Sequence, residues 1–248
     1  MKRNIKLILE YDGANYHGWQ SQAGTGRPTI QETLEQAIGT LARDEPKTYS
    51  SGRTDAGVHA YGHVVNFHTE CAIPAHAWTP ALNHALPDDI RVLSSEEVPA
   101  DFHARFSALG KTYQYRILNR PAPSALHRGR AWHIPRELDL TAMRRGAEQL
   151  LGTHDFSAFR SSGCGAKTPT RTLRDLTIRL SGEFVEITLE ADAFLMHMAR
   201  NIVGTLVEVG QGSRSADDMR RILTSCDRTR AGRIAPACGL YLVKVYYP

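Results

Sequence analysis

The 248 residues of this chain are 42% hydrophobic and 23% charged, a composition that excludes a disordered or fibrous protein and fits one large globular domain or two of ordinary size. The formal net charge of +4 is too small to indicate a nucleic-acid partner by itself. No stretch of the sequence is long and apolar enough to cross a membrane, and the first residues lack the apolar block of a signal peptide. The 4 cysteines form no CxxC pair, so we expect reduced thiols in the cytoplasm and no metal or redox site built from them.

The first half of the chain is predicted to contain both strands and helices. Residues 4–10 alternate polar and apolar side chains, as a half-buried strand does. Thr29 and Glu32 form a capping-box pattern, and the apolar residues that follow recur on one face of a helix. We therefore expect strands at 4–10 and 63–68 and helices at 30–41 and 75–85.

The second half contains the same element types without a detectable sequence repeat. We expect strands at 111–118, 172–180, 184–191 and 240–247 and helices at 140–151, 194–209 and 215–225. Because strands and helices are mixed without strict βαβ alternation, the prediction is an α+β fold with largely antiparallel sheets. We expect two RRM-like or ferredoxin-like halves, an N-terminal domain at 1–108 and a C-terminal domain at 109–248, with helices on one face and a basic cleft on the other.

Positive charge is concentrated in two segments that contain no acidic residue, 102–136 and 156–174. Solvated surfaces usually mix charges of both signs, so such segments favour a polyanionic partner. Tyr113, Tyr115 and Trp132 lie among the arginines of the first segment, and a sheet face with aromatic and basic side chains is an arrangement that binds RNA. The alternative is that these arginines form ion pairs with acids elsewhere in the chain.

One carboxylate stands out because of its surroundings. Asp55 lies in the segment 52–60, with the sequence GRTDAGVHA, between two glycines and near Arg53 and His59. Glycines allow backbone conformations that side chains forbid and let another molecule approach closely, and the basic residues stabilise an ionised acid. Asp55 is therefore a candidate nucleophile. The alternative is that it only caps a turn through its own backbone.

Several ordered motifs extend this observation over nearly the whole chain, which resembles the TruA-type tRNA pseudouridine synthases. The motifs that carry the resemblance lie at 11–20, 52–60, 101–107, 111–115, 194–204 and 239–243. The resemblance implies an isomerase with the pseudouridine-synthase fold, which converts uridine to its C-glycoside isomer at positions 38–40 of the tRNA anticodon stem-loop without a cofactor or metal. It also implies a homodimer. The sequence contains no Walker loop or dinucleotide fingerprint, in agreement with this expectation.

The resemblance assigns roles to four residues. Asp55 matches the family's nucleophile, which adds either to C6 of the uracil or to C1′ of the sugar; the residues do not choose between these routes. Tyr113 matches the aromatic residue that packs against the target base. Arg200 matches the basic partner that keeps the acid ionised where desolvation would raise its pKa. Arg53 is expected to contact the RNA around a flipped nucleotide.

Other residues of these motifs are expected to be structural. We interpret His59 as scaffold and Tyr115 as sheet packing. The chain departs from the family at 61–63, where Tyr-Gly-His stands in place of a small or aliphatic residue followed by Gly-Gln. Two competing functions are a non-catalytic RNA-binding protein and a zinc nucleobase deaminase. The second needs an HxE and PCxxC pattern that this sequence lacks.

Overall fold

The structure is a computed structural model that describes residues 2–21, 26–43 and 45–248. The chain forms two compact units. The first unit comprises residues 1–109 and 241–248, and the second comprises residues 110–240. The sequence-based division at 108 and 109 stays a prediction, and it differs from these units in where it puts the last eight residues.

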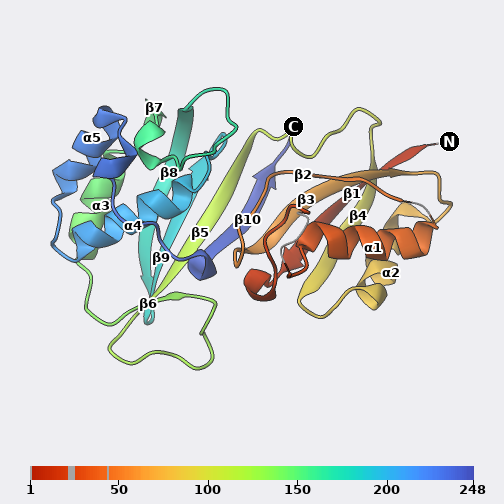
Figure 1. Cartoon of the computed structure of the whole chain (residues 1–248), viewed down its shortest axis with the longest axis horizontal. Coiled ribbons are helices and arrows are strands. Elements are labelled where there is room, and N and C mark those ends of the chain that lie inside the picture. Colours follow the sequence, from red (N-terminus) through yellow and green to blue (C-terminus); the bar gives the residue numbers. More distant parts are fainter. Residues whose placement is uncertain (1, 22–25, 44) are drawn as a thin grey trace. The chain divides into compact units, whose positions relative to one another are not determined.

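The first unit contains strands and two α-helices (Figure 1). Its strands are β1 (Arg3–Tyr11), β2 (Thr48–Ser50), β3 (His59–Thr69), β4 (Ile90–Val98) and β10 (Leu240–Tyr246), the last from Tyr241 onward, and its helices are α1 (Ile30–Ala42) and α2 (Trp78–Ala85). Strand β1 pairs antiparallel with both β3 and β4, β2 pairs antiparallel with β3, and β10 pairs with the start of β3 in parallel. The order β4-β1-β3-β2 with helices after β1 and β3 is the ferredoxin-like arrangement.

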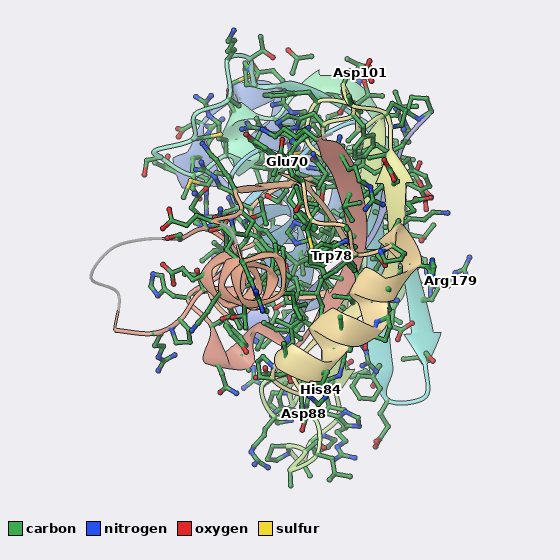
Figure 2. The ribbon with its side chains drawn as sticks, turned by 90° about the vertical axis from the view of Figure 1, so that its right-hand side faces the viewer. Glu70, Trp78, His84, Asp88, Asp101 and Arg179 are labelled. Carbon is green, nitrogen blue, oxygen red and sulfur yellow. The ribbon has the colours of Figure 1, made fainter. Side chains whose placement is uncertain are left out.

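Alternation along β1 decides which face of this sheet is covered by helices. Ile5, Leu7 and Leu9 are fully buried, and Ile5 and Leu7 lie opposite Phe67 and Val65 of β3. The helices supply the other half of this core, with the ring of Trp78 in α2 edge-on to Phe67 at 5.1 Å. Figure 2 shows α1 end-on and α2 beside it, and labels Trp78. Burial of this apolar face is the main stabilising contribution to the unit.

The strands of the second unit also pair largely antiparallel. Its strands are β5 (Gly110–Asn119), β6 (Trp132–Ile134), β7 (Gly152–Asp155), β8 (Thr170–Ser181) and β9 (Phe184–Ala191), and its helices are α3 (Leu140–Glu148), α4 (Met198–Gly210) and α5 (Ala216–Ser225). Within the unit the strand order is β5-β9-β8-β7, and β6 pairs with β5 in parallel. The predicted α+β class with largely antiparallel sheets is confirmed for both units.

Most predicted elements are present with shifted ends. The capping box at Thr29 and Glu32 begins α1 as expected. The helix predicted from 194 begins only at Met198, after His197 in a left-handed conformation with φ of 60°. The strand β4 was not predicted, because its Ser-Ser-Glu-Glu centre breaks the apolar alternation. In the described part of the chain, no helix has the length and hydropathy needed to span a membrane.

Candidate active site

Asp55 lies in an irregular loop between β2 and β3 of the first unit. The amide of Val58 donates to the carbonyl of Asp55 at 3.1 Å and closes a turn. Gly57 lies inside this turn with a φ of 77°, a left-handed conformation that side chains disfavour. Asp55 is half-buried and Arg53 is exposed. The loop therefore presents both side chains from a backbone that two strands hold at its ends.

The motif at 11–20 packs directly under this loop. The amide of Trp19 donates to the carbonyl of Thr54 at 3.0 Å. Gly18 has a φ of 79°, and a Cβ at its position would lie 2.5 Å from the Thr54 carbonyl oxygen and 3.0 Å from the carbonyl carbon of Asp55. A Cβ on Gly13 would overlap the carbonyl oxygen of Val58. Two glycines thus allow backbone to lie against backbone on both sides of Asp55.

Helix α1 holds this supporting segment in turn. The amide of Ile30, the first residue of the helix, donates to the carbonyl of Gly18 at 3.1 Å, and the next amide, of Gln31, donates to the carbonyl of Trp19 at 3.0 Å. These two donors belong to the first turn of the helix, where amides have no partner within the helix itself. A continuous backbone connection therefore runs from the start of α1 through Gly18 to Thr54 and Asp55.

A buried polar chain reaches the residue before Asp55. The hydroxyl of Tyr11 lies 2.8 Å from the hydroxyl of Thr54 and 2.8 Å from Nδ1 of His63. The ring of His63 is fully buried and packs 4.3 Å from the ring of Trp19. His63 is one of the residues at which the sequence departs from the family pattern, and its imidazole takes part in this hydrogen-bonded chain. These contacts fix the side of the loop that faces the core.

His59 has the surroundings of a structural residue. Its side chain is buried, and its Nδ1 lies 2.9 Å from a carboxylate oxygen of Asp12 and 3.1 Å from the amide nitrogen of Gly13. The ring stacks on Tyr241 of β10 at 4.7 Å. His59 therefore links the start of β3 to the motif at 11–20 and to the final strand.

Tyr113 and Tyr115 lie on β5 in the second unit and have different environments. The ring of Tyr113 lies edge-on to Phe194 at 4.9 Å. The ring of Tyr115 is fully buried, and its hydroxyl donates to the carbonyl of Pro236 at 2.7 Å. Burial raises the pKa of Tyr115 far above its ordinary value, even though Arg200 and Arg233 oppose this shift. Tyr115 therefore stays neutral, and its hydroxyl serves a structural hydrogen bond.

Arg200 lies in the first turn of α4, beside the segment that precedes β10. Its Nε donates to the carbonyl of Ala235 at 2.8 Å, and the amide of Ala235 donates back to the Arg200 carbonyl at 3.1 Å. One turn further on, a Cβ on Gly204 would overlap the carbonyl oxygen of Arg233. The close approach at Gly204 lets this segment run along the helix and orient the guanidinium of Arg200.

The arginines of the acid-free segments have different surroundings. Some form ion pairs with acids of β9 and its preceding turn, namely Arg116 with Glu186, Arg120 with Glu183 and Arg174 with Glu190, at 3.6, 2.7 and 4.0 Å. For these three, the alternative of pairing within the chain is correct. Arg160 and Arg171 instead lie near the thiol of Cys164. Burial raises the pKa of this thiol, but backbone hydrogen bonds at Met196 and Ala166, with smaller effects of the two guanidiniums, lower it overall.

No ligand set for a metal ion is present among the described residues, taking three or more His, Cys, Asp or Glu side chains as the criterion. A surface hollow of about 590 Å³ lies in the second unit at the start of α3 and α5. Its lining includes Glu137, Asp139, Arg145 and Arg214 and none of the four residues assigned from the sequence.

Comparison with known proteins identifies the family. A family model described as tRNA pseudouridine synthase matches residues 7–107 and 147–248. A protein of Acetivibrio thermocellus named tRNA pseudouridine synthase A is 51% identical over 245 residues, which cover 99% of this chain and 100% of that protein. A protein of Clostridium tetani named tRNA pseudouridine synthase A 2 is 47% identical, with 100% of both chains covered.

The chain belongs to the tRNA pseudouridine synthase A family. It is accordingly an isomerase that converts uridine to pseudouridine in tRNA. The similarity spans the full length of these two relatives. A further relative, from Rhodospirillum centenum, is 47% identical, with 98% of both chains covered.

The four residues with assigned roles differ in whether the family model covers them. Arg53, Asp55 and Arg200 fall within the matched spans, whereas Tyr113 lies in the gap between them. The residue types of the motif at 11–20 did not predict its position, and the structure shows its glycines against the backbone of the Asp55 loop. The two glycines of that motif were the available signal, because glycine is the residue that allows a close backbone approach.

Proposed function

We propose that this tRNA pseudouridine synthase acts on uridines 38–40 of the anticodon stem-loop, with Asp55 as the nucleophile and without a cofactor. The observation that carries the proposal is the backbone support of the Asp55 loop. The loop lies against the backbone of Gly13 and Gly18 and accepts a hydrogen bond from the amide of Trp19. A catalytic group must be held within a fraction of an ångström of its productive position, and rigid backbone support provides this. A carboxylate that only capped a turn would not need such support.

The chemistry favours a carboxylate. Pseudouridine formation breaks the bond between N1 and C1′, joins C1′ to C5, releases the C5 proton and protonates N1. Every other atom of the uridine is retained and there is no net oxidation or reduction, so the reaction requires no redox or group-transfer cofactor. The ionised carboxylate of Asp55 adds to C6 or to C1′ and leaves again, which divides one difficult step into two easier ones.

The remaining roles follow from side-chain chemistry. Tyr113 presents an aromatic ring for the target base, in a position defined by its contact with Phe194. Arg200 provides a guanidinium, oriented by its hydrogen bond to Ala235, that keeps Asp55 ionised when bound RNA excludes water. Arg53 is exposed two residues before Asp55 and binds a phosphate beside the flipped nucleotide. The enzyme acts in the cytoplasm and, as the sequence resemblance implies, as a homodimer.

The position of modification can be tested directly. We expect tRNA from cells that lack this protein to lose pseudouridine at positions 38–40, and purified protein to restore it on an unmodified transcript without added metal or nucleotide. Mapping pseudouridines in both tRNA populations measures this. Loss of pseudouridine at other positions, with 38–40 unaffected, would contradict the assignment.

The salt dependence of tRNA binding tests the basic residues. Each phosphate contact releases counterions, so the affinity should fall steeply with salt, and replacing Arg105, Arg160 or Arg171 with glutamine should reduce the slope of log affinity against log salt by about one unit each. Fluorescence anisotropy at a series of salt concentrations measures the slope. Arg120→Gln is the matched control, because Arg120 already pairs with Glu183 and is expected to leave the slope unchanged. An affinity that does not vary with salt would contradict this prediction.

A further inference from the structure

The face of the first sheet opposite its helices is covered by an irregular segment, residues 99–107, here called the covering segment. It contains the sequence Asp-Phe-His-Ala-Arg-Phe-Ser at 101–107, a motif to which no task has been assigned. Figure 2 labels Asp101 near the start of this motif.

Buried amides fix the covering segment to the sheet. Asn4 of β1 donates to the carbonyls of Pro99 and Phe102 at 3.0 and 2.9 Å. Asn66 of β3 donates to the side-chain oxygen of Asn4 at 3.0 Å and accepts from the amide of Ala104 at 2.9 Å. Both asparagines are almost fully buried, so breaking these bonds would leave polar groups without partners at a cost of about 1–3 kcal/mol each.

Tyr247, which follows β10, holds the covering segment at the same residue, Ala104. The hydroxyl of Tyr247 donates to the carbonyl of Ala104 at 2.6 Å, and its ring lies 5.1 Å from Phe102. Lys6 lies over both rings, at 5.7 and 5.6 Å from their centroids. Ala104 is therefore held through both its amide and its carbonyl, and the two residues that follow it start from a fixed backbone.

Those two residues point outward. Arg105 is exposed, and the side chain of Phe106 is 76% exposed, in a unit whose other phenylalanines are buried or half-buried. Phe106 contacts the ring of His103 at 4.4 Å, and His103 contacts Tyr49 of β2 at 5.0 Å. Tyr49, His103 and Phe106 form what we call the aromatic row.

Two cations lie beside the aromatic row. The guanidinium of Arg105 lies 5.6 Å from the Phe106 ring centre, and the ammonium of Lys47 lies 5.9 Å from that of Tyr49. Both side chains are exposed. Burial, together with the charge of Arg105 and the nearby His68, lowers the pKa of His103, so its ring is neutral at neutral pH. The row therefore offers uncharged stacking surfaces between two positive charges.

We propose that the aromatic row is a docking surface for tRNA, in which an unpaired base stacks on Phe106 while Arg105 and Lys47 bind the adjoining phosphates. Aromatic rings that accept bases, flanked by cations that follow the backbone, are the general means of binding unpaired nucleotides. A rigid exposed phenylalanine suits this task, because no ordering of the protein opposes binding. This inference rests on the proposed action on tRNA, and it adds a contact outside the Asp55 loop.

The test compares Phe106→Ala with Phe106→Tyr and with Leu93→Ala. Leu93 is a half-exposed apolar residue of β4 in the same unit and serves as the matched control. Because Phe106 is largely exposed, its replacement by alanine should leave the fold intact, which the melting temperature checks. The probes are an unmodified tRNA transcript and a fully paired RNA duplex, with affinities measured by fluorescence anisotropy at one salt concentration.

We expect Phe106→Ala to weaken tRNA binding about tenfold, the loss typical of removing one base-aromatic stack. Phe106→Tyr keeps the ring and should retain the affinity, as should Leu93→Ala, and the duplex should bind all variants equally. Unchanged tRNA affinity in Phe106→Ala, or an equal loss on the duplex, would overturn the proposal.

Sedimentation of the protein without RNA distinguishes a different occupant. A change in oligomeric state in Phe106→Ala would assign this surface to a second copy of the chain and overturn the tRNA proposal. Failure of the catalytic assignment is separate, because it is detected by pseudouridine formation in an Asp55 variant whose aromatic row is intact.

Discussion

Replacing Asp55 with asparagine is expected to abolish pseudouridine formation while leaving tRNA affinity almost unchanged. Asparagine has nearly the same size and shape as aspartate, but its neutral amide is a very poor nucleophile. Because the carboxylate forms the covalent bond on which both later steps depend, we expect turnover to fall by about a thousandfold or more. Release of tritium from C5-labelled uridine in tRNA measures turnover, and anisotropy measures binding.

The control for this variant is Asp88→Asn. Asp88 is a fully exposed acid of the same unit, paired with Arg91 at the surface and labelled in Figure 2. It should show wild-type turnover. Undiminished turnover in Asp55→Asn would eliminate Asp55 as the nucleophile, and a protein that binds tRNA but never forms pseudouridine in either form would favour the non-catalytic RNA-binding alternative.

Replacing Gly18 with alanine is expected to reduce turnover about a hundredfold, because a misplacement of about 1 Å in a catalytic group has an effect of this size. The new Cβ would lie 2.5 Å from the Thr54 carbonyl oxygen, so the backbone beside Asp55 must move. The left-handed φ of 79° adds a conformational cost, and together the two effects should lower the free energy of unfolding by about 2–4 kcal/mol. Turnover and urea unfolding measure the two consequences.

Gly212→Ala separates these two effects. Gly212 has a φ of 74°, but no atom lies within 4 Å of the position of its Cβ. This variant should lose only about 1 kcal/mol of stability through the backbone conformation and should keep its turnover. If Gly18→Ala is destabilised yet fully active, the packing under the loop does not position Asp55.

Local signals in the sequence were sufficient for the elements they specify. The capping box at Thr29 and Glu32 satisfies amides within one turn of helix α1, so no distant residue is needed to begin it. In β1 the apolar alternation alone predicts which side chains enter the core. β3 begins earlier in the chain than predicted, and α4 begins later, after the left-handed His197. Residues 59–62 extend β3, and the start of β10 pairs with its first two residues.

Distant contacts decided the features that sequence reasoning missed. Asn66 breaks the apolar run of β3 and was not assigned a role, yet it accepts from Ala104, 38 residues away. Tyr247 reaches the same alanine across 143 residues. Strand register likewise decided which arginines form ion pairs, as where β5 and β9 place Arg116 opposite Glu186.

The sequence by itself determined the α+β class, the family and the identity of Asp55 as candidate nucleophile, because each of these depends on residue type and spacing along the chain. Only the tertiary structure shows which contacts hold the Asp55 loop in its shape. The close approach of Gly13 and Gly18 to the loop joins segments about forty residues apart, and only the folded backbone brings a carbonyl to the place where a Cβ would otherwise lie. The exposure of Phe106 was decided in the same way, since a phenylalanine is apolar in any sequence and becomes a surface feature only when the hydrogen bonds of Ala104 hold its backbone over the face of the sheet.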